Sequence, residues 1–313
     1  MALAVRLDDA EIGAFSRQLE DLEAQAERTE PIDLPFFNGE IVPLDFRNMP
    51  WAQFWTYRQI DHVGSFRLAR NYTTDIPTVE TRFREFRRTI KKWESSYWYS
   101  EDDIAAVVRM GESLESERIY SVQESYAQTL NDLVAFGDPS IEMDGFINHK
   151  DALRIEAAYP LNSSSTAKQQ LAVLNHVVNS IVKITKGKEK PDTFLMPTTE
   201  RDFLANNLIE IGSSALPKTV LQHFLDTNGY IQNIVALNEC DKETLEEVGA
   251  GDKSVVIAYK RDKAKVKARI YQSLSWLPAR AQGVDNWARP CRFKYGGIDL
   301  RRPMSMAVAE LPE

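Results

Sequence analysis

Histidines and paired carboxylates are the residues of this 313-residue chain best suited to chemistry, because they can carry protons or bind metal ions. None of the four histidines has a second His or a Cys three or four residues away, the spacing typical of metal ligands. Carboxylate pairs such as Asp102-Asp103 and Glu246-Glu247 lie in charged, helix-like stretches, where a helix start and a solvated face explain them. The histidines are His62, His149, His176 and His223. These residues therefore predict neither an acid–base centre nor a metal site.

Sequence motifs for phosphate binding and nucleophilic catalysis are absent as well. The chain has no GxxxxGK[ST] loop, no GxGxxG opening a helix after a strand, and no GxSxG nucleophile turn. The nearest candidates, Gly249-Ala250-Gly251 and Gly296-Gly297, are typical of turns. Cys240 and Cys291 lie far apart without CxxC spacing, which indicates reduced thiols in a cytosolic product. We expect no enzyme activity and no cofactor.

The composition is that of an ordinary globular protein. With 43% hydrophobic and 27% charged residues, the length fits two domains or one large domain. The 38 basic and 46 acidic side chains give a net charge of −8, which argues against a dedicated nucleic-acid-binding domain. No run of about 18 apolar residues is present, and the start MALAVRLDDAEIG lacks the basic and apolar regions of a signal peptide. We therefore expect no membrane partner.

Charge divides sharply between the first two 50-residue segments. Residues 1–50 carry four basic and eleven acidic side chains, a net charge of −7, whereas residues 51–100 carry nine and five, a net charge of +4. Cations interleaved with aromatic residues can bind single-stranded nucleic acid, but a solvated or salt-bridged protein face is the simpler interpretation. Opposite charge on two such segments suits contact between neighbouring copies of the chain.

The first 50 residues divide into a helical and an extended part. Ile12, Phe15, Leu19, Leu22 and Ala26 repeat at spacings of three and four, which predicts an amphipathic helix over residues 7–28. Four prolines between residues 30 and 50 then favour extended backbone. The apolar side chains of this extended part need a covering surface, either on a neighbouring copy or on the chain's own domain.

Residues 51–99 give conflicting signals. The turn-prone sequence NYTTDIP predicts the tip of a long ribbon near residues 71–77. Heptad spacing nevertheless favours a helix over the second half of the segment. The residues that show this spacing are Val79, Phe83, Phe86, Ile90, Trp93 and Tyr97. Periodicity alone predicts a helix here.

The remaining elements alternate in type, which indicates an α+β fold. A long helix is predicted over residues 100–137, with Ser100 as N-cap, Gly137 as the stop and Gly111 as an interruption. Further helices are predicted over residues 167–185, 199–208 and 216–228, with Pro217 in the first turn of the last. Strands are predicted over residues 193–197, 230–239, 253–262 and 263–274, the last crossing a polar surface. Residues 289–311 predict two strands joined around Gly296-Gly297.

A helix-like stretch over residues 99–149 contains Gly137-Asp138 and then Gly145-Phe146-Ile147-Asn148, and residues 291–311 contain Gly296-Gly297 followed by Pro303. These two stretches resemble the major capsid proteins of tailed bacteriophages with the Hong Kong 97 fold, particularly their encapsulin-like branch. Residues 99–149 are similar to the family's spine helix followed by a Gly-Asp…Gly-Φ-x-Asn turn (Φ, an apolar residue), here Gly137-Asp138 and Gly145-Phe146-Ile147-Asn148. Residues 291–311 are similar to the family's closing Arg-x-Gly-Gly-Φ-x-Φ-x-x-Pro sequence. The resemblance covers roughly residues 30–311, but outside these two stretches only the order of helices and strands is similar.

The resemblance implies a Hong Kong 97-type capsid fold of the α+β class and a division of the chain into five segments. The implied segments are an N-terminal arm (1–50), an extended loop with its base (51–99), the spine helix of the peripheral domain (100–137), the axial domain (138–251), and return strands of both domains (252–313). In contrast to the helical periodicity, it implies a β-hairpin for residues 63–93. The lysine crosslink of some relatives is not predicted, because the sequence shows no matching glutamate environment. We expect the N-terminal segment to be retained rather than removed by maturation cleavage.

The arm and the extended loop would then both lie on neighbouring subunits. The predicted loop contacts are the cations Arg82, Arg84, Arg87, Arg88, Lys91 and Lys92. The predicted arm contacts are the apolar residues Leu34, Phe36, Phe37 and Ile41. Arms that reach over neighbours enlarge an interface beyond what a compact body allows.

The implied function is that of a major capsid protein, which self-assembles into hexamers and pentamers of an icosahedral phage head enclosing double-stranded DNA, without sequence-specific DNA binding. Portal, scaffolding and cement proteins are further expected partners, and the expected location is the virion, assembled in the host cytoplasm. The alternative is the shell protein of an encapsulin-type bacterial nanocompartment that encloses cargo enzymes. A soluble α+β enzyme is a third possibility, and gel filtration distinguishes it because an enzyme elutes as a small oligomer.

Overall fold

The computed structural model describes residues 33–63, 79–100, 114–209, 217–282 and 286–312. Residues 34–313 form one compact unit, and residues 1–33 belong to a second unit, of which only Asp33 is described. The helix predicted over residues 7–28, the ribbon tip near 71–77 and the helix interruption at Gly111 lie outside the described residues. Division of the larger unit into peripheral and axial domains stays a prediction.

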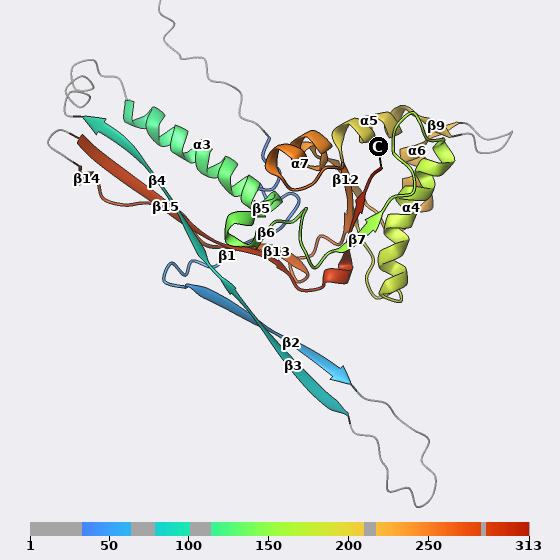
Figure 1. Cartoon of the computed structure of the whole chain (residues 1–313), viewed down its shortest axis with the longest axis horizontal. Coiled ribbons are helices and arrows are strands. Elements are labelled where there is room, and N and C mark those ends of the chain that lie inside the picture. Colours follow the sequence, from blue (N-terminus) through green and yellow to red (C-terminus); the bar gives the residue numbers. More distant parts are fainter. Residues whose placement is uncertain (1–32, 64–78, 101–113, 210–216, 283–285, 313) are drawn as a thin grey trace, which may run out of the picture. The chain divides into compact units, whose positions relative to one another are not determined.

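The first of two five-stranded sheets is built largely from the end of the chain. In the order β1-β13-β15-β14, strand β1 runs parallel to β13, and the other pairs are antiparallel. β4 pairs with the first ten residues of β15. The long helix α3 (Leu114–Ala135) packs against β4, β13 and β15 (Figure 1). The strands are β1 (Leu44–Phe46), β4 (Lys91–Ser100), β13 (Val266–Trp276), β14 (Arg280–Ala281) and β15 (Asn286–Leu300).

The central strands of the second sheet are buried on both faces, and this sheet separates two hydrophobic cores. Its order is β11-β8-β12-β16-β7. Alternate residues enter different cores: in β12, Ile257 packs with α3 and the first sheet, whereas Val256 and Ala258 pack under α4 and α6. Burial on both faces explains the unbroken apolar sequence VVIAY of β12. The strands are β7 (Leu153–Glu156), β8 (Thr193–Met196), β11 (Asn233–Ala236), β12 (Val255–Tyr259) and β16 (Met306–Glu310).

Helices α4, α5 and α6 cover one face of the second sheet. α4 (Ala167–Ile184) begins with a capping box in which Thr166 and Gln169 exchange hydrogen bonds. α5 spans Thr198–Asn206, and α6 spans Val220–Thr227. The helix predicted over residues 216–228 is present as α6, but Pro217 is not in its first turn. Thr219 caps α6, and the preceding strand β10 (Lys218–Thr219) pairs with β9 (Leu208–Ile209). α7 (Lys242–Val248) follows a short 3-10 turn, η2 (Asn238–Cys240), and contributes Leu245 to the core that contains α3.

The turn after α3 explains the first capsid-like motif. Gly137 has a positive φ of 75°, and a Cβ on it would lie 2.1 Å from the carbonyl oxygen of Met143. A Cβ on Gly145 would lie 2.2 Å from the carbonyl carbon of Phe136. The Asn148 side chain accepts a hydrogen bond from the Gly145 amide at 2.8 Å. The motif is therefore needed to pack β5 (Gly137–Asp138) closely against β6 (Met143–Asp144), with the 3-10 turn η1 (Pro139–Ile141) between them.

The last strands differ from the sequence prediction. Gly296 and Gly297 lie inside β15, and the chain instead turns at η3 (Pro303–Ser305) before β16. The prediction of two strands joined around these glycines is therefore wrong. The first six residues of β13 are buried, so this strand does not cross a polar surface.

Residues 54–63, 80–89 and 91–100 form strands, so the helix predicted from the periodicity is wrong. A β-hairpin is present in the described residues, as the resemblance implies, but most of its first strand precedes the predicted range 63–93. β2 (Phe54–Val63) pairs with β3 (Glu80–Thr89) in an antiparallel hairpin, and β4 follows after Ile90. The heptad spacing joined residues with different surroundings, since Ile90 and Tyr97 are buried whereas Phe83 and Phe86 are exposed. Two residues three apart, such as Phe83 and Phe86, lie on opposite faces of a strand.

Candidate assembly surface

The β2–β3 hairpin exposes apolar side chains on both faces. The described residues show no third strand beside it. On one face Ile60 lies opposite Phe83, and these side chains are 53% and 67% exposed. On the other face Tyr57 stacks on Phe86, with 4.9 Å between ring centroids, and Phe86 remains exposed. A two-stranded hairpin is marginally stable alone in water, so these faces are suited to burial against another surface.

The cations predicted to lie in the loop have different surroundings. Arg84 and Arg87 are exposed, and the guanidinium of Arg87 lies 3.8 Å from the Phe54 ring centroid. Arg88 is half-buried and lies 3.7 Å from the carboxylate of Asp151 on the body of the unit. Two lysines follow in β4, of which Lys91 is half-buried and Lys92 lies 2.7 Å from Glu94. The side chain of Arg82 lies outside the described part. Arg84 and Arg87 are thus the described arginines of this set that remain exposed on the hairpin.

Trp55 fixes the base of the hairpin, and the sequence analysis did not identify it. Its side chain is 5% exposed, its indole N–H donates to the Gly296 carbonyl at 2.8 Å, and the Arg269 guanidinium lies 4.2 Å from its ring centroid. A Cβ on Gly296 would lie 2.7 Å from the Tyr271 ring and 3.2 Å from the Trp55 indole nitrogen. Glycine inside a strand often marks such a close approach, so Gly296 was the signal that could have located this contact.

A buried ion pair lies under the Trp55 ring. Asp299 is fully buried and accepts two hydrogen bonds from Arg269, at 2.6 and 3.0 Å, and a third from Arg301 at 3.2 Å. Burial opposes the charge on Arg269, but the bonds to Asp299 outweigh burial and raise the pKa of the guanidinium. The hairpin base therefore rests on a fixed positive charge held by Asp299.

The apolar arm residues do not behave as predicted. Phe36 and Ile41 are fully buried in the unit's own core beside α3, so the prediction that they contact a neighbouring subunit is wrong. Asn131 of α3 accepts hydrogen bonds from the backbone amides of Phe36 and Phe37, at 3.1 and 3.3 Å. Leu34 and Phe37 are half-buried, and their contact with a neighbour stays a prediction. The chain's own domain thus covers Phe36 and Ile41, and residues 35–42 form turns and bends rather than the extended backbone that the prolines predicted.

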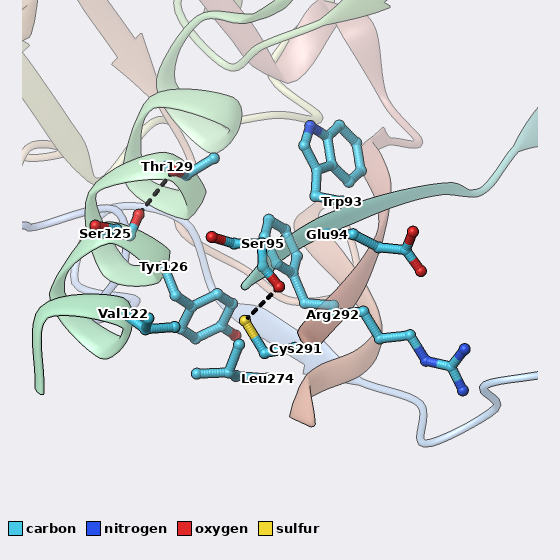
Figure 2. A pocket seen from close by; sticks show the side chains of 11 residues that line it. Trp93, Glu94, Ser95, Val122, Ser125, Tyr126, Thr129, Leu274, Cys291 and Arg292 are labelled. Atoms are coloured by element: carbon cyan, nitrogen blue, oxygen red, sulfur yellow. Dashed lines mark hydrogen bonds between the residues drawn. The ribbon is translucent and has the colours of Figure 1, made fainter. Parts of the chain in front are cut away.

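A small groove of about 190 Å³ lies between α3 and strands β4 and β15 (Figure 2). Trp93 stacks on Phe293 with 5.4 Å between ring centroids, and Tyr126 meets Phe293 edge-on at 4.9 Å. The Cys291 thiol donates to the Ser95 carbonyl at 3.3 Å, and burial raises the pKa of this thiol. Because the thiol stays protonated, the groove presents no activated nucleophile.

The described residues contain no arrangement suited to catalysis by a metal. No group of three or more His, Cys, Asp or Glu side chains among them could hold a metal ion.

Asp241 has a pKa raised to about 6 by burial and by the nearby carboxylates Glu200, Glu243 and Glu239. Among the described residues, no helix has the length and apolar character needed to cross a membrane.

Comparisons with known proteins agree with this architecture. A family model described as major capsid protein matches residues 65–310. The chain is similar to the capsid of Myoviridae phage XM1, with 16% identity, a TM-score of 0.77 and coverage of 99% of this chain and 100% of that chain. A native GTA particle capsid gives 8% identity and a TM-score of 0.64, covering 98% and 100%. A chain of Microbacterium phage Oxtober96 is 10% identical with a TM-score of 0.61, and the match covers 98% of this chain and 100% of that chain. No curated protein matches the sequence.

The fold is that of phage capsid proteins, which confirms the fold implied by the resemblance. The chain belongs to the major capsid protein family, since the family model matches most of its length. It is therefore a structural protein of a phage head, and its family is not one of enzymes. The family match supports the capsid interpretation over the nanocompartment alternative.

Proposed function

We propose that copies of this chain assemble into hexamers and pentamers of an icosahedral head, and that the β2–β3 hairpin of each copy is covered by a neighbouring copy. The observation that carries the proposal is the exposure of Ile60 and Phe83 side by side on a hairpin that has no further strand beside it in the described residues. Many copies then multiply a modest contact into a closed shell.

The finer details of the proposal follow the capsid family. The extended loop is assigned to residues 51–99, the spine helix to 100–137, the axial domain to 138–251 and the return strands to 252–313. The head encloses double-stranded DNA without reading its sequence, which agrees with a net charge of −8 for the chain. Portal, scaffolding and cement proteins are proposed as further partners, and assembly is proposed to take place in the host cytoplasm.

Replacing both exposed apolar residues, as Ile60→Ser with Phe83→Ser, tests the proposed contact. Full burial of such a side chain is worth about 1.5–3 kcal/mol. Because these side chains are only about half to two-thirds exposed, the pair should contribute about 2–4 kcal/mol per contact. The concentration needed for assembly should rise about 30- to 1000-fold.

Sedimentation velocity and negative-stain microscopy measure this concentration, and circular dichroism checks that the body stays folded. The matched control is Thr56→Ser with Thr81→Ser, which changes two positions on the same hairpin face and leaves both apolar side chains in place. Normal particles from the Ile60→Ser, Phe83→Ser variant at the wild-type concentration would contradict the proposal.

A further inference from the structure

His149 lies in the segment between β6 and β7 and is buried, with 1% of the residue exposed. Its Nδ1 atom accepts a hydrogen bond from the backbone amide of Asp151 at 3.2 Å. The neutral ring therefore carries its proton on Nε2. The Nε2 atom is also buried and has no hydrogen-bond partner among the described residues, whereas most buried polar atoms are paired. The function proposed above gives this histidine no role.

The same segment contacts the hairpin through the side chain of Asp151. Its carboxylate lies 3.7 Å from the guanidinium of Arg88 in β3. Arg88 lies opposite Trp55, the residue that fixes the base of the hairpin. Asp151 thus contacts His149 through its backbone and the hairpin through its carboxylate. A change at one of these contacts is therefore passed to the other through a single residue.

The surroundings of His149 oppose protonation of its ring. Burial lowers the pKa of His149 below its ordinary value of 6.5, and the positive charge of Arg88 lowers it further. Asp151 and Asp144 act in the opposite direction, and Lys150 adds to the lowering. Lys150 also lies 3.2 Å from the Asp144 carboxylate and so partly offsets its charge. The ring is therefore neutral at pH 7 and takes up a proton only in more acidic solution.

Protonation of the ring is incompatible with its contact to Asp151. A proton on Nδ1 occupies the lone pair that accepts the Asp151 amide, so two N–H groups would then point at each other. The imidazolium would also repel the guanidinium of Arg88. We propose that His149 is a pH-sensitive switch for the hairpin: when the ring takes up a proton from the solvent, the turn at Asp151 opens and its ion pair with Arg88 is lost. The switch acts within one copy of the chain, and its consequence, weaker assembly in acid, rests on the proposed function.

Hydrogen exchange, measured by mass spectrometry on the unassembled full-length chain, tests the switch. The exchange rate in β2 and β3 is divided by the rate in the strands of the second sheet, so that the intrinsic dependence of exchange on pH cancels. Acidification from about pH 7.5 to about pH 5 spans the titration of a histidine. We expect the ratio to rise about fivefold over this range, since a partly exposed ion pair contributes up to about 1 kcal/mol.

His149→Asn assigns the effect to the histidine. The asparagine oxygen can accept the Asp151 amide in place of Nδ1, but the side chain takes up no proton in this range. The exchange ratio should therefore stay constant on acidification. Asp241, whose pKa is about 6, titrates in the same range and is retained in this variant, so a rise caused by Asp241 would persist.

Asp151→Asn tests the ion pair without relying on the first variant. It keeps the backbone amide that donates to His149 and removes the charge that pairs with Arg88. The exchange ratio should be about fivefold higher already at neutral pH and should change little on acidification. The matched control is Glu85→Gln, which removes an ion pair of 3.8 Å with Arg58 inside the hairpin and should leave the wild-type response to pH in place.

Three results would overturn the inference: an unchanged ratio in the wild type, an equal rise in His149→Asn, or a ratio in Asp151→Asn that matches the wild type at both pH values. Exchange of the hydrogen on the Cε1 atom of His149, followed in the same samples, reports titration of the ring directly. A ring that stays neutral down to about pH 5 would also overturn the inference. These measurements use unassembled chains, so failure of the chain to form particles would contradict the proposed function alone.

Discussion

Replacing Trp55 by alanine should loosen the base of the hairpin, because this side chain makes three separate contacts there. The Arg269 guanidinium lies 4.2 Å from its ring centroid, the Tyr57 ring stacks on it at 5.6 Å, and its indole N–H donates to the Gly296 carbonyl. Removal of a buried tryptophan costs about 3–5 kcal/mol. The ion pair between Arg269 and Asp299 survives the change, so no buried charge loses its partner. We expect the free energy of unfolding to fall by about 4 kcal/mol.

Trp55→Phe separates the ring from the hydrogen bond. Phenylalanine retains an aromatic ring for Arg269 and Tyr57 but cannot donate to the Gly296 carbonyl. Leaving a buried acceptor without its donor costs about 1–3 kcal/mol. The free energy of unfolding should therefore fall by about half as much as in Trp55→Ala.

Urea unfolding of the unassembled full-length chain measures both losses, and hydrogen exchange locates them. Exchange should accelerate in β2 and β3 more than in the second sheet, because Trp55 packs in a small cluster with Ile90 and Tyr271 rather than in either large core. The reasoning is refuted if Trp55→Ala costs less than about 1 kcal/mol, the range of ordinary surface substitutions. Uniform acceleration across the unit would refute the local role of this residue.

Two further substitutions test the contact of Asn131 with the Phe36 segment and the raised pKa of Asp241. Asn131→Ala should lower the free energy of unfolding by about 2 kcal/mol, because the amides of Phe36 and Phe37 lose their acceptor; urea unfolding checks this, and a loss below about 0.5 kcal/mol would contradict it. The folded pKa of Asp241, about 6, lies above its ordinary value of 3.8, so the folded state binds this proton more tightly and loses stability as pH rises from about 4 to 6. Asp241→Asn should therefore stabilise the chain at pH 7, by about 1 kcal/mol after allowance for solvent screening, and should have little effect at pH 4; an equal gain at both pH values, measured by urea unfolding, would contradict the assignment.

Local sequence patterns predicted the elements whose burial is decided locally. The helix predicted over residues 167–185 is α4, and the strand predicted over residues 193–197 is β8. In α4 the buried residues, such as Val173, Val177 and Ile181, fall on one helical face, and Thr166 begins the helix with its own capping box. In both elements the residues that predict the helix or strand lie within a few positions of the residues that form it.

Residues 91–97 could not be predicted in this way, because they pair with a strand that lies far away in the sequence. β4 pairs residue by residue with β15, about 200 positions later in the sequence, from Lys91 opposite Tyr295 to Ser100 opposite Asn286. Trp93 and Tyr97 are four residues apart and lie on the same face of a strand as well as of a helix. Their spacing therefore does not distinguish the two, and the hairpin was favoured by the turn-prone sequence near residues 71–77 and by the resemblance to capsid proteins.

For the candidate contact residues, the sequence predicted exposure better than burial, and their contact with a neighbouring copy stays a prediction. Arg84 and Arg87 are exposed on the hairpin, as an interface requires, and a cationic sequence is enough to suggest this. The burial of Phe36 depends on Asn131, which lies 95 residues away and presents an acceptor to the Phe36 amide. No spacing within residues 30–50 carries that information. Contact with a neighbouring subunit was therefore predicted for Phe36 and Ile41, although both pack in the core beside α3.

The buried charges under the hairpin are better explained by the orientation of the hairpin than by a gain in folding stability. Replacing a buried ion pair with apolar residues is often neutral or stabilising, so Arg269 and Asp299 need another reason to occupy this position. Ten residues of strand extend about 33 Å, so a tilt of about 10° at the base would move the far end of the described hairpin by about 6 Å. A displacement of that size exceeds the reach of a side-chain contact such as the one proposed for Phe83. If the base serves mainly to aim the hairpin, Trp55→Phe should reduce particle yield more than its loss of unfolding free energy accounts for, because it retains the packing and loses the directional bond to Gly296.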